Sequence, residues 1–192
     1  MLQGFLQYKF KPSDRLFFTA GIHSQYFDIN GSSSMEPRLG AKWNMKEDQS
    51  LSVGFGMHSQ MQPTYIYFTH ITDSNGIKVF HNKDLGFTRS IHHVLAYDVA
   101  LSRNLRIKAE AYYQYLYEVP IDIYSSSYSV LNQGSGYDRF FPDTLTNKGT
   151  GKNIGTEITI EKFFSRDFFF MITASVFDSK YKGSDGVERN TD

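Results

Sequence analysis

The stretch LRIKAEAYYQYLY, residues 105–117, alternates between apolar and polar side chains. One set of alternate positions is apolar or aromatic: Leu105, Ile107, Ala109, Ala111, Tyr113, Tyr115 and Tyr117. The set between them is mostly polar: Arg106, Lys108, Glu110, Tyr112 and Gln114. Successive side chains of a strand point to opposite sides, so this pattern predicts a long β-strand with one apolar and one polar face. A helix would spread the three charged residues around most of its circumference.

The same alternation recurs along the chain. Seven further segments show it, at residues 2–11, 16–25, 38–43, 51–58, 91–101, 154–161 and 168–176. Most of these strands are about ten residues or longer, the length that a tilted strand needs to cross a bilayer. Strands of soluble proteins usually have about five or six residues. We therefore expect an all-β protein, an antiparallel transmembrane β-barrel segment of about eight long strands.

The connections between these strands alternate in length. Tight turns are expected at residues 11–14, 46–49, 102–104 and 164–167, and long connections at 27–34, 60–90, 119–151 and after Lys180. Outer-membrane barrels have this asymmetry, with short periplasmic turns and long extracellular loops. We therefore expect the long connections to face outward.

The two faces of each strand then have different surroundings. A charge on the lipid face at the bilayer midplane costs about 2–4 kcal/mol. We therefore expect Arg106, Lys108, Glu110, Glu157 and Glu161 to point into the lumen, and the apolar face to contact outer-membrane lipid.

Composition excludes several functions. The 192 residues carry 20 basic and 20 acidic side chains, so there is no overall basic field to attract nucleic acid. The chain has no cysteine, which excludes disulfides and thiolate chemistry. A mean hydropathy of −0.41 and the lack of a long apolar run argue against a transmembrane helix. Met1–Phe5 is not the start of a secretory signal. The chain is then either cytosolic or an incomplete piece of an exported protein, and we expect the incomplete piece.

Several sequence blocks resemble the barrel of large TonB-dependent outer-membrane receptors. The block MEPRLG, residues 35–40, resembles the strand of those receptors that contains the letters EPR. The block GFGMHSQMQP, residues 54–63, resembles the strand after it. Further similar blocks lie at residues 90–98, 108–120, 147–157 and 177–181. Nearly the whole chain is similar to the middle to C-terminal part of the barrel, in receptors with a carboxypeptidase-regulatory-like N-terminal extension.

This resemblance implies a parent protein with a 22-strand barrel, an N-terminal plug and the TonB energy-transducing complex as a partner. Such receptors bind an extracellular iron chelate, cobalamin or glycan and import it across the bacterial outer membrane. Residues 1–192 would be one partial barrel domain that lacks the plug and the final strands. The resemblance implies no cofactor. Two alternatives stay open: a small self-contained barrel with a structural or adhesive role, and a soluble all-β binding protein.

The candidate site residues are few. His58 and Gln60 lie near the outer end of a strand, and Tyr124, Tyr128 and Tyr137 lie in a long loop, where they could contact a ligand. His92 and His93 are adjacent, so on a strand they face opposite sides and cannot share a metal ion. No spacing matches a set of metal ligands, and no motif of a nucleophilic enzyme is complete. We expect no catalytic, cofactor or metal site, and no enzymatic activity.

Overall fold

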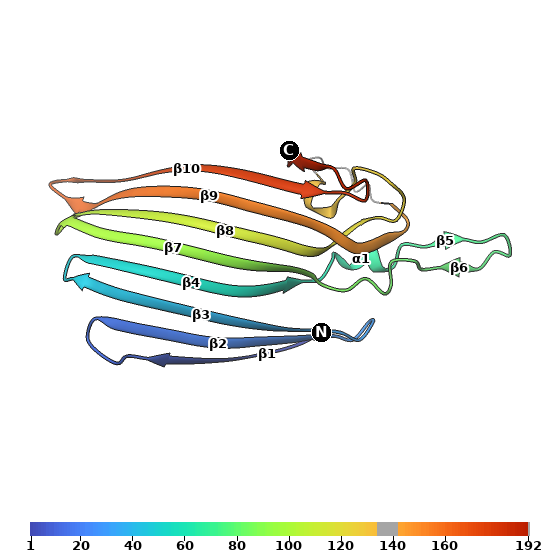
Figure 1. Cartoon of the computed structure of the whole chain (residues 1–192), viewed down its shortest axis with the longest axis horizontal. Coiled ribbons are helices and arrows are strands. Elements are labelled where there is room, and N and C mark those ends of the chain that lie inside the picture. Colours follow the sequence, from blue (N-terminus) through green and yellow to red (C-terminus); the bar gives the residue numbers. More distant parts are fainter. Residues whose placement is uncertain (134–141, 192) are drawn as a thin grey trace.

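The computed structural model describes residues 1–133 and 142–191. It contains a sheet of nine antiparallel strands that lie side by side in the order of the sequence (Figure 1). The strands of this sheet are β1 (Leu2–Phe10), β2 (Leu16–Phe27), β3 (Ser32–Lys46), β4 (Gln49–Gln60), β7 (Thr88–Ser102), β8 (Leu105–Asp122), β9 (Leu145–Ser165), β10 (Phe168–Lys182) and β11 (Glu188–Asn190). All except β11 have between 9 and 21 residues, which confirms the prediction of eight long antiparallel strands.

The connections contain three kinds of short element. Helix α1 is Thr64–Tyr67, and the two-residue strands β5 (Ile71–Thr72) and β6 (Lys78–Val79) pair as a hairpin that projects beyond the sheet (Figure 1). A 3₁₀ turn, η1, is Val130–Asn132. Within the described residues, neither helical element has the length and apolar character needed to span a membrane.

The strand register keeps residues of one kind on one face. One row across the sheet is Phe10, Phe18, Ala41, Val53, Leu95, Ala111, Thr156 and Val176. A row on the opposite face is Gly21, Arg38, Gly56, His92, Gln114, Asn153 and Ser179. We call these the apolar face and the polar face. A slip of one residue in any pair would exchange them, so the register confirms the two-faced strands predicted from the sequence.

The four tight turns lie together at one end of the sheet, which we call the turn end (left in Figure 1). Residues 47–48, 103–104 and 166–167 form two-residue connections, and residues 11–15 form the other turn. Arg166 and Asp167 both have positive φ angles, of 51° and 68°. This is the backbone twist that two-residue hairpins favour.

The prediction of a long connection is wrong at two places. The connection over residues 27–34 is a tight turn of residues 28–31, because β2 and β3 pair as far as Phe27 and Ser32. Gly31 provides the positive φ angle, 72°, that the turn requires. After Lys180 the chain does not enter a long loop. Strand β10 continues to Lys182, turns over residues 183–187 and returns as β11.

The two true long connections, residues 61–87 and 123–144, lie at the opposite end, the loop end. A hydrophobic cluster there joins β2, the first connection and the start of β9: Phe27, Ile66, Tyr67, Leu85, Phe87 and Leu145. Phe27 lies two residues beyond Gln25 on the polar face, and its ring centroid is 5.0 Å from that of Tyr67. We call this packed region the loop cap. It covers the loop end of the polar face.

Candidate functional site

A buried carboxylate organises the polar face near the loop end. The Glu36 side chain, in β3, is only 2% exposed. One oxygen accepts hydrogen bonds from Gln25 Nε2 at 2.6 Å and Ser34 Oγ at 3.1 Å. The other lies 2.9 Å from His23 Nδ1 and 3.1 Å from Arg38 Nη2. Because a buried charge is costly unless it is paired, these four partners are what allow the carboxylate to stay there.

A chain of side-chain hydrogen bonds crosses the polar face from β7 to β10. Ser90 Oγ lies 2.9 Å from Nε2 of His92, which lies 2.7 Å from Gln114 Nε2. Asn153 Nδ2 donates to Gln114 Oε1 at 2.6 Å. Ser179 Oγ then donates to Asn153 Oδ1, also at 2.6 Å. Gln114, Asn153 and Ser179 share one row of the register. The pairing of the strands therefore holds these three side chains at hydrogen-bonding distance.

A pocket of about 430 Å³ opens on the polar face over β4, β7 and β8, and the second network forms part of its lining. His58, Gln60, Ser90, His92, Gln114 and Leu116 are among the residues that line it. The rings of His58 and His92 meet edge to face, with centroids 4.7 Å apart. The lining offers imidazole, amide and hydroxyl groups, together with the side chain of Leu116. It is suited to a ligand recognised mainly through hydrogen bonds.

Charged side chains occupy the polar face nearer the turn end. Arg106 makes a bidentate contact with Asp98 and lies 3.8 Å from Glu161. Lys108 pairs with Glu110 at 2.8 Å. Glu157 lies directly opposite Glu110 in the register. Glu110 thus has an ion-pair partner, whereas no ion pair of Glu157 occurs in residues 1–133 and 142–191.

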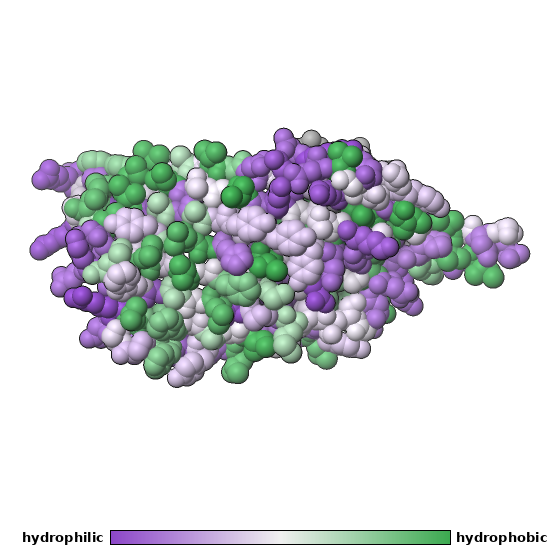
Figure 2. Space-filling view, in the orientation of Figure 1, coloured by the Kyte–Doolittle hydropathy of each residue, from purple (hydrophilic) through white to green (hydrophobic). Residues whose placement is uncertain are grey.

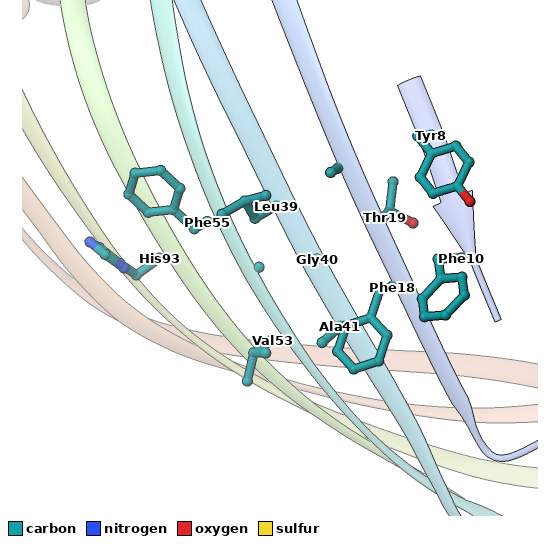
Figure 3. A pocket seen from close by; sticks show the side chains of 12 residues that line it. Tyr8, Phe10, Phe18, Thr19, Leu39, Gly40, Ala41, Val53, Phe55 and His93 are labelled. Carbon is teal, nitrogen blue, oxygen red and sulfur yellow. The ribbon is translucent and has the colours of Figure 1, made fainter. Parts of the chain in front are cut away.

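The apolar face is exposed in the isolated chain. Green hydrophobic groups are spread over the middle of the strands in Figure 2, and hydrophilic groups gather at the turn end. Large side chains on this face include Val53, 50% exposed, Ile158, 51%, and Ile172, 58%. A shallow pocket of about 460 Å³ lies between Phe18, Leu39, Val53 and Phe55 (Figure 3). An apolar surface this extensive needs an apolar environment.

The histidines divide as expected between the faces. His92 contacts the hydrogen-bonded chain of the polar face, whereas His93 lies on the apolar face, 5.3 Å from the Phe55 ring and 6.4 Å from the Tyr113 ring. Across the described ranges, no group of three or more histidine or acidic side chains is arranged to hold a metal ion.

The candidate site residues have different surroundings. His58 and Gln60 line the polar pocket. Tyr124 is exposed, at 73%. Tyr128 packs against the loop cap, and its hydroxyl accepts a hydrogen bond from Gln133 Nε2 at 2.9 Å, so it helps to build the loop. Burial raises the pKa of its phenol above the ordinary 10.0. Tyr137 lies outside the described residues.

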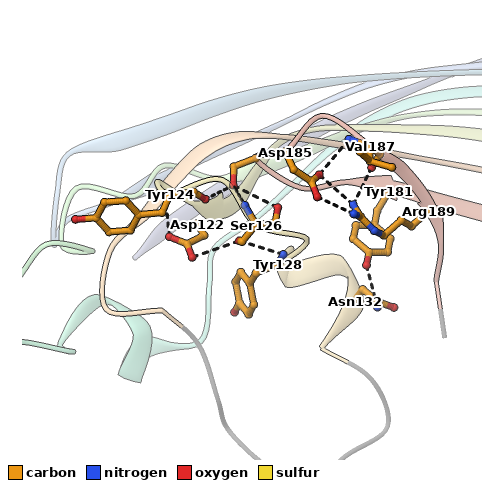
Figure 4. Close-up of polar contacts among 10 residues, drawn as sticks. Asp122, Tyr124, Ser126, Tyr128, Asn132, Tyr181, Asp185, Val187 and Arg189 are labelled. Atoms are coloured by element: carbon orange, nitrogen blue, oxygen red, sulfur yellow. Dashed lines mark hydrogen bonds and ion pairs between the residues drawn. The ribbon is translucent and has the colours of Figure 1, made fainter.

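The connection that carries these tyrosines is fastened to the β10–β11 hairpin (Figure 4). Ser126 N donates to Ser184 Oγ at 2.9 Å, and Asp185 N donates to the Ser126 carbonyl at 3.2 Å. Asn132 Nδ2 donates to the hydroxyl of the buried Tyr181 at 3.3 Å. The first part of the loop is thus held at a fixed place at the loop end.

Glu36, Gln114 and Asn153 are not among the site residues predicted from the sequence. For Glu36 a signal was present, because Ser34 and Arg38 flank it at the two-residue spacing that puts all three on one face. The other two could have been found only by aligning neighbouring strands from their tight turns.

No protein-family model and no curated protein matches this sequence. A solved structure does match the fold: the outer-membrane transporter YddB from Escherichia coli, with a TM-score of 0.65 and 14% sequence identity. The match covers 93% of this chain and 26% of the transporter chain. The chain thus spans about a quarter of the length of that protein. At this identity the likeness concerns the fold alone, and it shows that the nine-stranded sheet has the architecture of a wall segment of an outer-membrane transporter barrel.

Proposed function

We propose that the chain forms part of the wall of an outer-membrane transporter, in which its apolar face contacts lipid and its polar face lines the lumen. The observation that carries the proposal is the register of eight long strands, which places Val53 and Ile158 on one face and Gln114 and Asn153 on the other. The fold likeness to an outer-membrane transporter supports the same arrangement.

We further propose that the wall contributes to ligand binding and performs no chemistry itself. The polar pocket beside His58 and Gln60 lies on the lumenal face, below the loop cap. A ligand entering from the loop end would meet hydrogen-bonding side chains there. Import in a TonB-dependent manner, past a plug inside a barrel of 22 strands, is the finer form of the proposal. It is supported by the resemblance of residues 35–40 and 108–120 to such receptors.

The first experiment tests the faces. Residues 1–192 contain no cysteine, so the single substitutions Ile158→Cys and Thr159→Cys each place one thiol at a known position in this segment. The protein is labelled in isolated outer membranes and mixed with lipids that carry a fluorescence quencher on the acyl chain. We expect strong quenching of the label at position 158. The neighbouring position 159 should react with a water-soluble maleimide and escape quenching. Equal quenching at both positions would contradict the proposal.

The second experiment tests import. Strains with and without the gene are grown with ferric citrate, cyanocobalamin or a maltooligosaccharide as the limiting nutrient. A growth defect on one nutrient, reproduced when TonB is removed, is the expected result. Growth that depends on the gene but not on TonB would contradict TonB-dependent import. It would remain consistent with the proposal that the chain forms part of the wall of a transporter.

A further inference from the structure

Three lysines gather on the apolar face at the loop end. Lys152 of β9 lies opposite Lys180 of β10, and Lys182 lies two residues further along the same strand face. We call them the rim lysines. Lys182 is in turn opposite Glu188 of β11, and all three lysines act electrostatically on the Glu188 carboxylate.

Two of the rim lysines pair with carboxylates and remain partly exposed. Lys152 Nζ lies 2.9 Å from Glu188, and Lys180 Nζ lies 3.1 Å from Asp178. Their side chains are 43% and 32% exposed. Lys182 makes no ion pair within the described parts of the chain, so three lysines and two carboxylates leave a formal excess of one positive charge.

The position of these lysines follows a chemical gradient along the face. Val176 and Ile158 lie towards the middle of the strands, and Tyr115 lies opposite Lys152 in the register. The ring of Tyr115 stacks on that of Tyr117, with centroids 6.1 Å apart. In Figure 2 hydrophilic groups gather over the ends of β10 and β11, beside the green surface of the strand middles. This order, apolar then aromatic then cationic, is the order of acyl chains, interface and headgroups in a bilayer.

We propose that the rim lysines bind the phosphate groups of an anionic glycolipid in the outer leaflet. The proposal rests on the proposed function, since it needs the loop end to face outside the cell. A lysine ammonium is a compact point charge on a flexible stem, suited to a phosphate at the membrane surface. Glu188 and Asp178 each pair with one of the other two lysines, and Lys182, which makes no ion pair in the described residues, can contact a phosphate oxygen.

The test uses the full-length membrane protein in phosphatidylcholine nanodiscs that contain a small share of bis-phosphorylated lipid A. The discs are dissolved in detergent, the protein is repurified from the released lipid, and the glycolipid still bound per protein is measured by mass spectrometry. The variant carries Lys152→Gln, Lys180→Gln and Lys182→Gln. The matched control carries Lys46→Gln, Lys78→Gln and Lys83→Gln, which remove the same charge away from the rim. A lysine at an anionic surface changes binding by about fivefold. We therefore expect the rim variant, which lacks three lysines, to retain less glycolipid than the unaltered protein by a factor of about ten or more. The control should match the unaltered protein.

Two further arms identify the source of the phosphate. Dephosphorylated lipid A should be retained poorly by every variant, and an excess of inorganic phosphate should not displace the phosphorylated form. Equal retention by the rim variant and the control, or of the two lipids, would overturn the proposal, as would displacement by inorganic phosphate. Quenching of a label at Ile158→Cys is measured in the same nanodiscs. If quenching is lost, the proposed function is wrong. If it persists while retention is equal, only the rim-lysine assignment is wrong.

Discussion

The carbonyl oxygen of Ser126 lies 2.5 Å from the point where a Cβ atom on Gly183 would stand. The loop after β8 and the β10–β11 hairpin therefore touch through their backbones. We expect Gly183→Ala to separate them and to destabilise their contact by about 1–3 kcal/mol, the usual cost of forcing an atom into a packed site. Faster hydrogen exchange of the Ser126 and Asp185 amides, which bond across this contact, would report the separation.

Gly54→Ala is the matched control for that substitution. The nearest atom to a Cβ at this position is 3.9 Å away, an ordinary contact distance. Exchange at Ser126 and Asp185 should not change. A similar acceleration in both variants would mean that the loss of glycine weakens the sheet in general and that the close approach has no particular role.

Ile158→Arg is expected to block membrane folding of the protein, whereas Thr159→Arg should be tolerated. The two residues point to opposite faces of β9, and on the proposed lipid face an arginine near the midplane costs about 2–4 kcal/mol. Folding is measured by the shift in electrophoretic mobility between heated and unheated samples in detergent. The facing assignment fails if the two variants fold to the same extent.

Glu36→Ala should destabilise the nine-stranded sheet although no ligand is present. The substitution removes the acceptor shared by Gln25, Ser34 and His23. A buried polar group left unpaired, such as the Ser34 hydroxyl, costs about 1–3 kcal/mol. Urea unfolding in detergent, followed by tryptophan fluorescence from Trp43, measures the loss. Glu47→Ala, in an exposed turn, is the control and should unfold as the unaltered protein does. Identical curves for both variants would refute a structural role for the Glu36 network.

The loop cap should open in alkali. Burial raises the pKa of the Tyr67 phenol above the ordinary 10.0. The backbone N–H of Gln62 donates to the phenol oxygen at 3.0 Å and lowers the pKa by a smaller amount. The folded loop cap favours the protonated phenol, and this preference stabilises the folded state. The stabilisation is complete below about pH 10 and is lost as the pH rises through the raised pKa of Tyr67. Protease cleavage within residues 61–87 should therefore increase above about pH 10.

Tyr67→Phe tests the effect of the phenol hydroxyl separately from the packing of the loop cap. It removes the ionisable group and should flatten the pH dependence of cleavage, at the expense of the hydrogen bond from Gln62, about 1 kcal/mol. Tyr124→Phe, at an exposed position in the other loop, should leave the pH dependence as it is. An alkaline rise in cleavage that persists with phenylalanine at position 67 would exclude Tyr67 as its cause.

The faces and the tight turns could be predicted because both depend on local chemistry. The alternation of residues 105–117 fixes which side chains share a face, since the period of a strand is two. The pairs of turn residues at 103–104 and 166–167 then fix which strands are neighbours. No knowledge of distant residues is needed for either step.

Contacts between strands could not be predicted in the same way. Whether Glu110 meets Glu157 depends on the register of two strands joined by a long connection, and the sequence does not state that register. Tyr128 looked available to a ligand because it lies in a polar loop, yet the loop folds back and packs it against the cap. The burial of Glu36 likewise needs the tight turn at 28–31, which composition alone did not reveal.

The strand order has a consequence for how the sheet is assembled. Each strand of the nine-stranded sheet pairs with its neighbour in the sequence, and β4 and β7 are separated only by the loop that contains α1 and the β5–β6 hairpin. Most pairings therefore close a loop of only a few residues, which favours rapid pairing. The β4–β7 and β8–β9 pairings instead close the long connections of residues 61–87 and 123–144. The sheet can grow by the addition of one hairpin after another to an exposed edge. A defect in a single strand would then stop growth at that strand and leave the preceding ones paired.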